Sequence, residues 1–413
     1  MKPILRKNTA YSSDRPDYVL AVCKSPLEID PEHWNALLDL QADPTPFMRH
    51  EYLAAMHESG SATPKSGWTA RFMVLRTRKD SDQSGGGDMV AACALYLKDH
   101  SYGEYVFDHS WANAYHQHGL SYYPKALVAP PFTPVPGARL LARDDDARAA
   151  LVRELIAWCA HAGLSSLHLL FASDADVSAC SAAGMMLRHN VQFHWTSPQP
   201  AYAGFEQFLA SLSQDKRKKI RQERRKVEQA GVSFRWSLGS DISSPDWDFF
   251  YRCYERTYYE HGNAPYLSRD FFRQMSRTMP ECWLLFVAER AGRPVATSLI
   301  GIQDPGARSG KTRIAYGRYW GALERVDCLH FEACYYQPLE WCITHGFQRF
   351  EGGAQGEHKM ARALLPVPTT SAHWLAHPGF AEAVKNFLKR EDAGMANYME
   401  ELEQRNPFKS APT

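Results

Sequence analysis

The chain has 413 residues, of which 45% are hydrophobic and 23% are charged, and this composition is typical of a folded globular protein. A chain of this length exceeds a single ordinary core and predicts two or three domains. The net charge of +1 excludes a protein that binds nucleic acid or a membrane surface through its overall charge, and no apolar run approaches the roughly 18 residues of a membrane span.

The N-terminal residues and the cysteines bear on location. Basic residues near the start are followed by a polar stretch and not by the apolar segment of a signal peptide. The nine cysteines are an odd number without any C-x-x-C spacing, which favours reduced thiols over disulfide bonds or a zinc site. We therefore expect a cytoplasmic protein without a membrane span, and we expect no metal site.

The first half of the chain predicts strands and helices in a mixed order. The residue pattern favours a strand at 18–22, a helix that begins after Asp30, strands at 69–76 and 89–97, a helix at 147–161 and a strand at 166–171. Asp30 can cap its helix because the proline that follows it suits a first turn. A glycine- and serine-rich segment at 80–88 separates the two middle strands, so we expect them to form a hairpin.

The second half repeats this plan. It predicts strands at 283–289 and 294–302, a strand at 312–320, a helix at 331–345 and a strand at 347–351. The last helix and strand match those of the first half at identical spacing, with Trp158-Cys159, Gly163-Leu164 and Leu167 corresponding to Trp341-Cys342, Gly346-Phe347 and Phe350. Convergent packing can produce such a match, but the preceding hairpins match as well. We interpret the chain as two copies of one α/β module, residues 1–199 and 200–413, joined near 195–202.

A basic segment lies at the start of the second module. Residues 205–227 carry a helical apolar stripe that is interrupted near Lys216. From Asp215 to Lys226 the local charge is +6, so the rest of the chain carries −5. Such a run is usually a solvated helix face, but its concentration here also fits an anionic ligand. The candidate contacts are Lys216, Arg217 and Arg221.

Polar and aromatic side chains also gather in the first module and near the end of the chain. They fit either an acceptor pocket or the protein core, since aromatic residues at this density are more often core. We name seven candidates for substrate binding: Asp108, His109, Tyr115, His116, Tyr123, His373 and Trp374.

A glycine-rich stretch follows the last predicted strand of the second module. Three of the five residues 352–356 are glycines, and they lie at the carboxyl end of a strand, where ligands bind in open α/β sheets. Side chains that can bind or transfer protons surround these glycines: Glu351, Gln355, Glu357 and His358. The alternative is a turn with solvated polar side chains.

Two modules of hairpin, strand, helix and strand resemble the acyltransferase fold of the GNAT superfamily used twice, as in the Fem-type transferases of peptidoglycan cross-bridge synthesis. Segments 110–115, 122–125, 131–141, 216–227 and 350–374 are similar to a bacterial family of GNAT-like, Fem-related N-acyltransferases of peptidoglycan biosynthesis or recognition. The resemblance spans about residues 18 to 400. It implies an α/β fold with a tandem duplication of a GNAT-like acyl-CoA N-acyltransferase module, and transfer of an acyl or aminoacyl group to an amine.

The resemblance also implies a donor site in the first module. Residues 132–139 lie where the GNAT fold holds a donor pyrophosphate, and the candidate contacts are Thr133, Gly137 and Arg139. The alternative is a crossover in which Arg139 pairs with the acidic residues 144–146. The sequence departs from the GNAT pattern between Trp320 and Phe331, where the pyrophosphate signature is missing. It also lacks room for the long helical arm of some Fem enzymes. Acyl-CoA is the donor we favour, and aminoacyl-tRNA is the alternative.

Amide formation needs a neutral amine, a base with a pKa near the working pH and a stabilised oxyanion. Glu351 is the first candidate for the base or for an amine-binding carboxylate, unless it is only salt-bridged to Arg349 or Arg362. His358 is the second candidate, with Glu357 to orient it. Backbone N–H groups of the glycines are candidates for the oxyanion site.

Three functions follow from these features. The first is an N-acyltransferase that acts on the amine of a peptide, an amino acid or a peptidoglycan precursor. The second is a Fem-like transferase that forms peptide bonds from aminoacyl-tRNA, with tRNA as a partner. The third is a non-catalytic binding protein for a peptidoglycan precursor or peptide. The sequence leaves the acceptor and the oligomeric state open.

Overall fold

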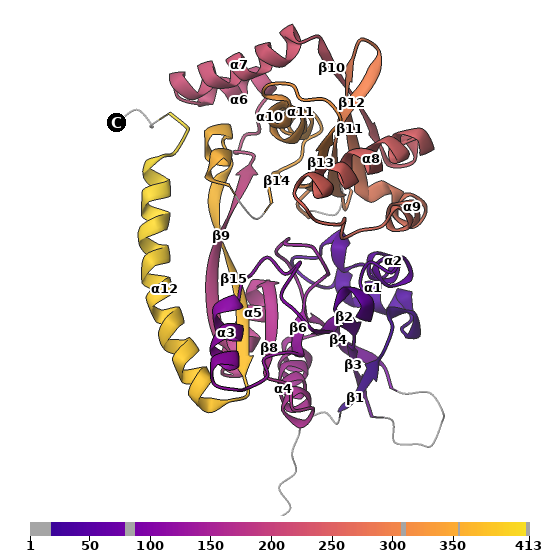
Figure 1. The fold of residues 1–413 in the computed structure, drawn as a ribbon, viewed down its shortest axis with the longest axis vertical. Coiled ribbons are helices and arrows are strands. Elements are labelled where there is room, and N and C mark those ends of the chain that lie inside the picture. Colours follow the sequence, from indigo (N-terminus) through magenta and orange to yellow (C-terminus); the bar gives the residue numbers. More distant parts are fainter. Residues whose placement is uncertain (1–17, 79–86, 307–310, 354–355, 410–413) are drawn as a thin grey trace, which may run out of the picture.

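A computed structural model describes residues 18–78, 87–306, 311–353 and 356–409. Its strands form a four-stranded sheet in the order β1-β3-β4-β7 and an eleven-stranded sheet in the order β10-β11-β12-β13-β14-β9-β15-β8-β6-β5-β2. Helices pack on these sheets (Figure 1), so the predicted α/β class is confirmed.

The first half contains nine strands and five α-helices within its described residues. The strands are β1 (Tyr18–Cys23), β2 (Trp68–Ala70), β3 (Phe72–Thr77), β4 (Met89–Cys93), β5 (Leu95–Lys98), β6 (Lys125–Val128), β7 (Leu141–Ala142), β8 (Ser166–Ala172) and β9 (Met186–Thr196). The helices are α1 (Pro31–Asp39), α2 (His50–Glu58), α3 (His109–Gln117), α4 (Asp145–His161) and α5 (Asp174–Ala182).

Local sequence signals account for several of these elements. The Asp30 carboxylate accepts hydrogen bonds from the backbone N–H groups of Glu32 and His33, at 2.8 and 3.1 Å, and so caps α1 as predicted. The predicted hairpin is interrupted at Arg71 and Ala94, and it therefore contributes β3 and β4 to the small sheet and β2 and β5 to the large one. Most of the segment predicted as its loop lies outside the described residues.

The second half contains the remaining elements. Its helices are α6 (Phe205–Ser211), α7 (Gln214–Gln229), α8 (Ser244–Glu260), α9 (Arg269–Thr278), α10 (Leu329–Phe331), α11 (Gln337–Thr344) and α12 (Pro378–Gln404). Its strands are β10 (Val232–Leu238), β11 (Trp283–Arg290), β12 (Arg293–Gln303), β13 (Ile314–Ala322), β14 (Arg349–Glu351) and β15 (Leu365–Leu375). A π-helical segment, Glu332–Tyr336, joins α10 to α11, and a 3-10 helix, Glu357–Arg362, precedes β15.

The repeat seen in the sequence corresponds to equivalent parts of the two halves. Helix α4 leads into β8, which is parallel to β6, and α11 leads into β14, which is parallel to β13. Cys159 and Cys342 are fully buried on the two helices. Gly163 and Gly346 follow the helices with φ of +67° and +70°, a left-handed conformation that favours glycine at a helix end.

The last strands of the two halves are exchanged. Strand β9 pairs with β14 of the second half, from Thr196–Arg349 to His194–Glu351, and with β15 along most of its length. Strand β15 in turn pairs with β8 of the first half. The large sheet therefore runs without interruption through the joint predicted near residues 195–202, and the two halves share it.

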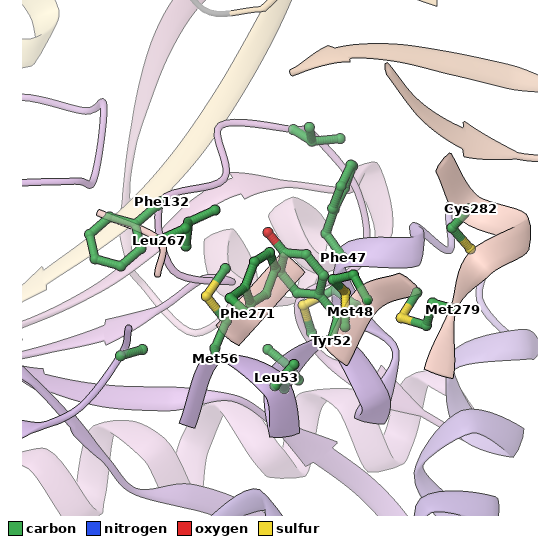
Figure 2. Packing of buried hydrophobic residues seen from close by; sticks show 14 of the residues in the cluster. Phe47, Met48, Tyr52, Leu53, Met56, Phe132, Leu267, Phe271, Met279 and Cys282 are labelled. Atoms are coloured by element: carbon green, nitrogen blue, oxygen red, sulfur yellow. The ribbon is translucent and has the colours of Figure 1, made fainter. Parts of the chain in front are cut away.

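The halves also share a hydrophobic core (Figure 2). Tyr52 of α2 packs against Phe271 of α9 with ring centroids 5.4 Å apart, and Phe47 contacts Tyr316 of β13 at 5.3 Å. These rings belong to one buried cluster that draws on both halves. Because each large aromatic side chain removes much apolar area from water, this cluster holds the halves together.

Helix α12 runs along β9 and β15 at the side of the molecule (Figure 1). Val384, Leu388 and Leu402 are its buried residues. Glu391, three residues after Leu388, accepts two hydrogen bonds from the Arg188 guanidinium of β9, at 2.8 and 2.7 Å. No helix in the described part of the chain is long and apolar enough to cross a membrane.

We predict that Glu391→Ala destabilises the protein by roughly 1–3 kcal/mol, because Arg188 is only 9% exposed and loses the carboxylate that neutralises it. Urea unfolding of the variant measures this loss. Glu400→Ala, on the exposed face of the same helix, is the control and should change stability by less than about 0.5 kcal/mol. Equal stabilities of the two variants would contradict the role of this ion pair.

Candidate active site

Strands β13 and β14 part at their carboxyl ends. They pair in parallel only from Ile314–Arg349 to Tyr316–Glu351. Beyond this point β13 continues to Ala322, whereas the chain after β14 turns towards β9, where the Gly352 N–H donates to the Phe193 carbonyl at 3.1 Å. Parting strands leave backbone groups without strand partners, so this is the position in an open sheet where a ligand can bind.

Glu351 lies at this point and is only 3% exposed. Its Oε1 is 3.0 Å from Arg349 Nε, and its Oε2 is 3.8 Å from His194 Nε2 of β9. Burial raises the pKa of the Glu351 carboxyl to about 7, and the charge of Arg349 only partly opposes this effect. The predicted ion pair with Arg349 is present, yet it leaves a carboxyl that can exchange a proton near neutral pH.

Lys359 is a second buried group with a shifted pKa. Its side chain is 4% exposed, and its Nζ donates to the Gly353 carbonyl at 2.9 Å. Burial lowers the pKa of the amine to about 8. Burial also lowers the pKa of His194 to about 3, and the charges of Arg349 and Lys359 add to this effect. His194 is therefore neutral beside Glu351.

Two glycines of this loop are favoured for different structural reasons. A Cβ on Gly352 would lie 2.4 Å from Leu364 Cδ2, so this residue must be small. Gly353 has φ of +86°, and a Cβ there would meet no atom closer than 3.9 Å, so its conformation and not its surroundings favours glycine. The glycine at position 352 thus allows close packing against other residues of the protein, and not against a ligand.

His358 lies on the 3-10 helix after the loop, on the exposed side. Its Nε2 is 3.0 Å from the hydroxyl of Tyr335, which the π-helical segment presents. Partial burial and the charges of Arg362 and Lys359 lower the pKa of His358, so the ring is neutral at pH 7. Such π-helical insertions occur often at functional sites because they redirect side chains.

Two further residues of the predicted catalytic set are not brought to this point. Glu357 is exposed and accepts hydrogen bonds from Tyr398 at 2.9 Å and Arg405 at 2.8 Å. It connects the loop to the C-terminal helix and does not orient His358, which corrects that expectation. Gln355 lies outside the described residues.

The donor site predicted in the first module does not fit the structure. Arg139 is fully buried, and its three guanidinium nitrogens donate to backbone carbonyls, including that of Leu170 at 2.8 Å. Thr133 is 3% exposed, and a Cβ on Gly137 would meet Thr45 Cγ2 at 2.6 Å. The loop therefore packs inside the protein with no surface for a pyrophosphate. Gly137 also bridges to Ala172, so the loop occupies the carboxyl end of the first parallel pair.

Helix α7 exposes much of its positive charge. Arg221 is exposed and pairs with Glu206 at 2.6 Å, while Lys216 and Arg217 are half-buried. The exposed cations beyond the three candidates are Lys218, Lys219, Arg225 and Lys226. The helix packs near the 3-10 helix that carries His358, on the second module's side of the site.

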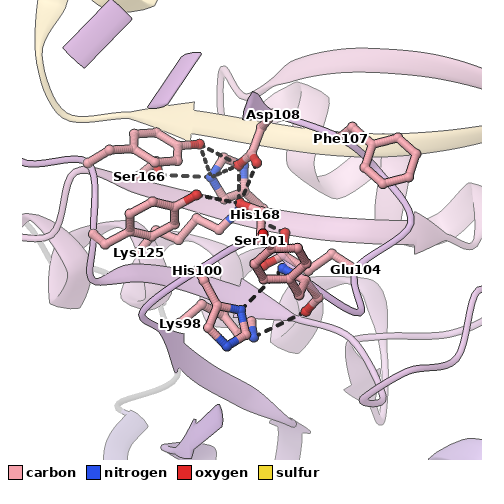
Figure 3. A network of polar contacts seen from close by, with 12 residues as sticks. Lys98, His100, Ser101, Glu104, Phe107, Asp108, Lys125, Ser166 and His168 are labelled. Atoms are coloured by element: carbon pink, nitrogen blue, oxygen red, sulfur yellow. Dashed lines mark hydrogen bonds and ion pairs between the residues drawn. The ribbon is translucent and has the colours of Figure 1, made fainter. Parts of the chain in front are cut away.

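A buried polar network occupies the other predicted cluster (Figure 3). Lys125 forms ion pairs with Glu104 and Asp108, and each of the three side chains is at most 4% exposed. Burial acts to raise the pKa of Asp108, but the charge of Lys125 holds this pKa well below its usual range. Tyr123 contacts the network through Ser101 at 2.8 Å. Both oxygens of Asp108 accept hydrogen bonds from this network, whereas Glu104 Oε1 has no partner among the described residues and burial raises the pKa of Glu104 to about 7. The network lies inside the protein, which indicates a structural role.

The remaining candidates divide between core and surface. His373 Nδ1 is 2.7 Å from His168 Nδ1, which connects it to the same network. Tyr115 stacks on Phe380 of α12 at 4.1 Å, and Trp374 is half-buried. His109 and His116 are exposed on α3. The cluster predicted for substrate binding is therefore mostly internal.

Sequence reasoning missed Lys359 and His194. Lys359 lay within the glycine-rich stretch, but a lysine gives no sign of burial in a sequence. His194 alternates with Val191, Phe193 and Trp195, a period-two pattern that would have predicted a strand with His194 on its other face.

A cavity of about 690 Å³ opens near the amino ends of β13 and β14, away from all these groups.

Comparisons with known proteins agree with this architecture. A family model described as FemAB-like, peptidoglycan biosynthesis/recognition, matches residues 25–410. No curated protein gives a significant match.

Three solved structures superpose with a TM-score of 0.50. They are a domain of Agrobacterium fabrum assigned to a lysylphosphatidylglycerol synthetase (11% identity, covering 89% of this chain and 97% of that one), L-PGS from Bacillus licheniformis (12%, 87% and 97%) and FemX (9%, 86% and 98%). At these identities the likeness concerns the fold alone, and it confirms the two-module GNAT-like architecture.

We predict that Lys125→Met destabilises the protein by about 3–5 kcal/mol, because Glu104 and Asp108 remain buried without their cation. Chemical denaturation measures the loss. His116→Ala, at an exposed position of the same module, is the control. A loss below about 1 kcal/mol for Lys125→Met would contradict a structural network.

We also predict a pH-dependent stability difference for Glu351→Gln. The folded-state pKa of Glu351 is raised from 4.5 to about 7. The difference in pKa therefore costs no stability below pH 4.5, where the carboxyl is protonated in both states, and it destabilises the folded state increasingly as pH rises to 7. Relative to wild type, the variant should gain up to about 3 kcal/mol between pH 4.5 and pH 8. Thermal unfolding across this range tests it, with Glu357→Gln as the exposed control. A difference in stability between the variant and the wild type that does not change with pH would refute the raised pKa.

Proposed function

The chain belongs to the FemAB-like family of peptidoglycan biosynthesis and recognition, and we propose that it is an N-acyltransferase that uses acyl-CoA to acylate the amine of a peptide, an amino acid or a peptidoglycan precursor. The observation that carries this proposal is the parting of β13 and β14 beside Glu351. A carboxyl with a pKa of about 7 at that point is matched to accepting a proton from an ammonium group at neutral pH.

The proposed reaction needs few groups from the protein. The acceptor's ammonium group transfers a proton to the Glu351 carboxylate, and the neutral nitrogen then forms a C–N bond to the thioester carbonyl carbon. The C–S bond breaks, and the thiolate of coenzyme A leaves and takes up the second proton, which the nitrogen releases as the amide forms. Holding both reactants between the parted strands supplies much of the rate, because it replaces a bimolecular encounter by a local one.

Lys359 is a positioning residue in this scheme. Its Nζ holds the carbonyl of Gly353, and this contact fixes the loop next to the end of β14. The exposed cations of α7 support an anionic donor, since phosphate groups are attracted to such a surface.

The same cations support a second candidate function, aminoacyl transfer from tRNA. Counterion release predicts that RNA binding by α7 weakens steeply as salt increases. Purified protein titrated with charged tRNA at several salt concentrations tests this candidate. Absence of RNA binding, or binding that is independent of salt, would remove it.

We predict that Glu351→Gln lowers kcat for acyl transfer by about 100-fold or more, because a base of matched pKa contributes a factor of this order. In the wild type, kcat/KM should rise with pH up to about 7, and this limb should disappear in the variant. The measurement is transfer of labelled acetyl groups from acetyl-CoA to an amine panel across pH.

Two results would count against the proposed function. Wild-type protein that transfers no acyl group from acyl-CoA or from charged tRNA would favour the non-catalytic binding alternative. A Glu351→Gln variant with unchanged kcat would show that another group accepts the proton. Glu357→Gln serves as the control, since its carboxylate contacts only the C-terminal helix among the described residues.

A further inference from the structure

A small cavity of about 320 Å³ lies between the end of α8 and the carboxyl-terminal half of β13. Arg318 and Tyr319 of β13 line it together with Tyr254 and Tyr258 of α8. Phe132 of the first half reaches this region, where its ring stacks on Tyr266 at 4.7 Å. The cavity therefore lies close to the junction of the two halves.

Arg318 is the extra residue of a β-bulge. Leu299 of β12 pairs with Tyr319 and Ile300 pairs with Gly317, so no residue of β12 is opposite Arg318. Bulges redirect a side chain and often lie beside active sites. Arg318 is two residues beyond Tyr316, the last residue of β13 that pairs with β14. The bulge thus places a guanidinium next to the point where the strands part.

The Arg318 guanidinium is held by neutral groups. Its Nη2 donates to the Phe132 carbonyl at 3.0 Å and to the Tyr319 hydroxyl at 3.2 Å, with Thr133 Oγ1 at 3.4 Å. The centroids of the Phe47 and Tyr319 rings lie 5.0 Å from it. The ionisable groups that act most strongly on it are tyrosines, and burial raises the pKa of Tyr52 and Tyr105 above its ordinary value, so their hydroxyls are neutral.

Three other partly or fully buried arginines differ in this respect, whereas the fully buried Arg139 uses its three guanidinium nitrogens on backbone carbonyls. Arg188, Arg224 and Arg362 each lie within 3 Å of a carboxylate. The hydrogen bonds of Arg318 within the described chain all come from its Nη2 and go to neutral oxygens, and no carboxylate of the described residues forms an ion pair with it. Arg318 is half-buried, and its buried Nε has no hydrogen-bond partner among the described residues. A partly buried guanidinium without a counterion attracts an anion, and its planar pair of N–H groups suits a carboxylate or a phosphate.

We propose that the acceptor amine carries an anionic group, a carboxylate or phosphate, which binds Arg318 in the tyrosine-lined cavity while the amine reaches the parted ends of β13 and β14. The spacing supports this arrangement, because a Cβ on Gly353 would lie 3.9 Å from the carbonyl oxygen of Gly317, the neighbour of Arg318. The inference rests on the proposed acyl transfer and specifies the acceptor class.

The test compares matched acceptors with and without an anion. L-alanyl-L-alanine is paired with its C-terminal amide, and O-phosphoethanolamine is paired with ethanolamine, with acetyl-CoA as donor. Arg318→Gln should raise KM for the charged member of a pair about tenfold or more and change the neutral member less than about threefold. Arg318→Lys should recover part of the loss. Arg269→Gln, which breaks an exposed ion pair with Asp248, is the control.

Calorimetric titration of the same probes without donor separates the two proposals. Binding of a charged probe that depends on Arg318, together with no transfer to any amine, would uphold this site and refute the acyl transfer. Equal losses for charged and neutral acceptors would show that Arg318 is only structural and would overturn the inference. Wild-type protein that binds the charged and neutral probes equally at millimolar concentration would also overturn the inference. The pair that responds to Arg318→Gln distinguishes a carboxylate from a phosphate.

Discussion

The pairing of β9 with β14 and β15 is the constraint on which the rest of the structure depends. Because successive strand residues face opposite sides, the register His194–Glu351 decides which face of the sheet receives both side chains. A shift by one residue would turn Glu351 towards the core under α11, where Phe350 now lies. Strand β9 also pairs with β15, and β15 pairs with β8 of the first half. The first half therefore cannot separate from the candidate site without breaking the sheet.

Buried charge is used in two ways in this fold. Lys125 forms ion pairs with both Glu104 and Asp108, and the hydroxyls of Ser101 and Tyr122 also donate to Asp108. Glu351 has Arg349 beside only one of its oxygens, and its Oε2 has no hydrogen-bond partner in the described chain. Burial then dominates the pKa of Glu351. Burial also raises the pKa of Glu104 to about 7, and its Oε1 has no hydrogen-bond partner among the described residues. Glu351 is therefore distinguished by its position at the end of β14, where β13 and β14 part, and not by its pKa alone.

The sequence predicted the repeated helix-strand units and the two-module architecture because local signals carry them, such as Asp30 at a helix start and Gly163 and Gly346 at helix ends. It did not predict the exchange of β9 and β15, since pairing partners distant in the chain leave no local pattern. The fate of Arg139 illustrates a second limit. A segment with a glycine, prolines and an arginine is compatible with a phosphate-binding loop and equally with a buried crossover. The structure distinguishes them because Arg139 is fully buried and donates to backbone carbonyls.

Duplication of the module produced two parallel strand pairs with different ends. In the first, the loop from Phe132 to Arg139 folds over the carboxyl end, and the bridge from Gly137 to Ala172 occupies the place of a ligand. In the second, β13 and β14 part with no such loop across them in the described chain. The loop that fills the first end also supplies the Phe132 carbonyl to Arg318. The first module therefore contributes a contact to the candidate site of the second, in addition to the sheet that the two modules share.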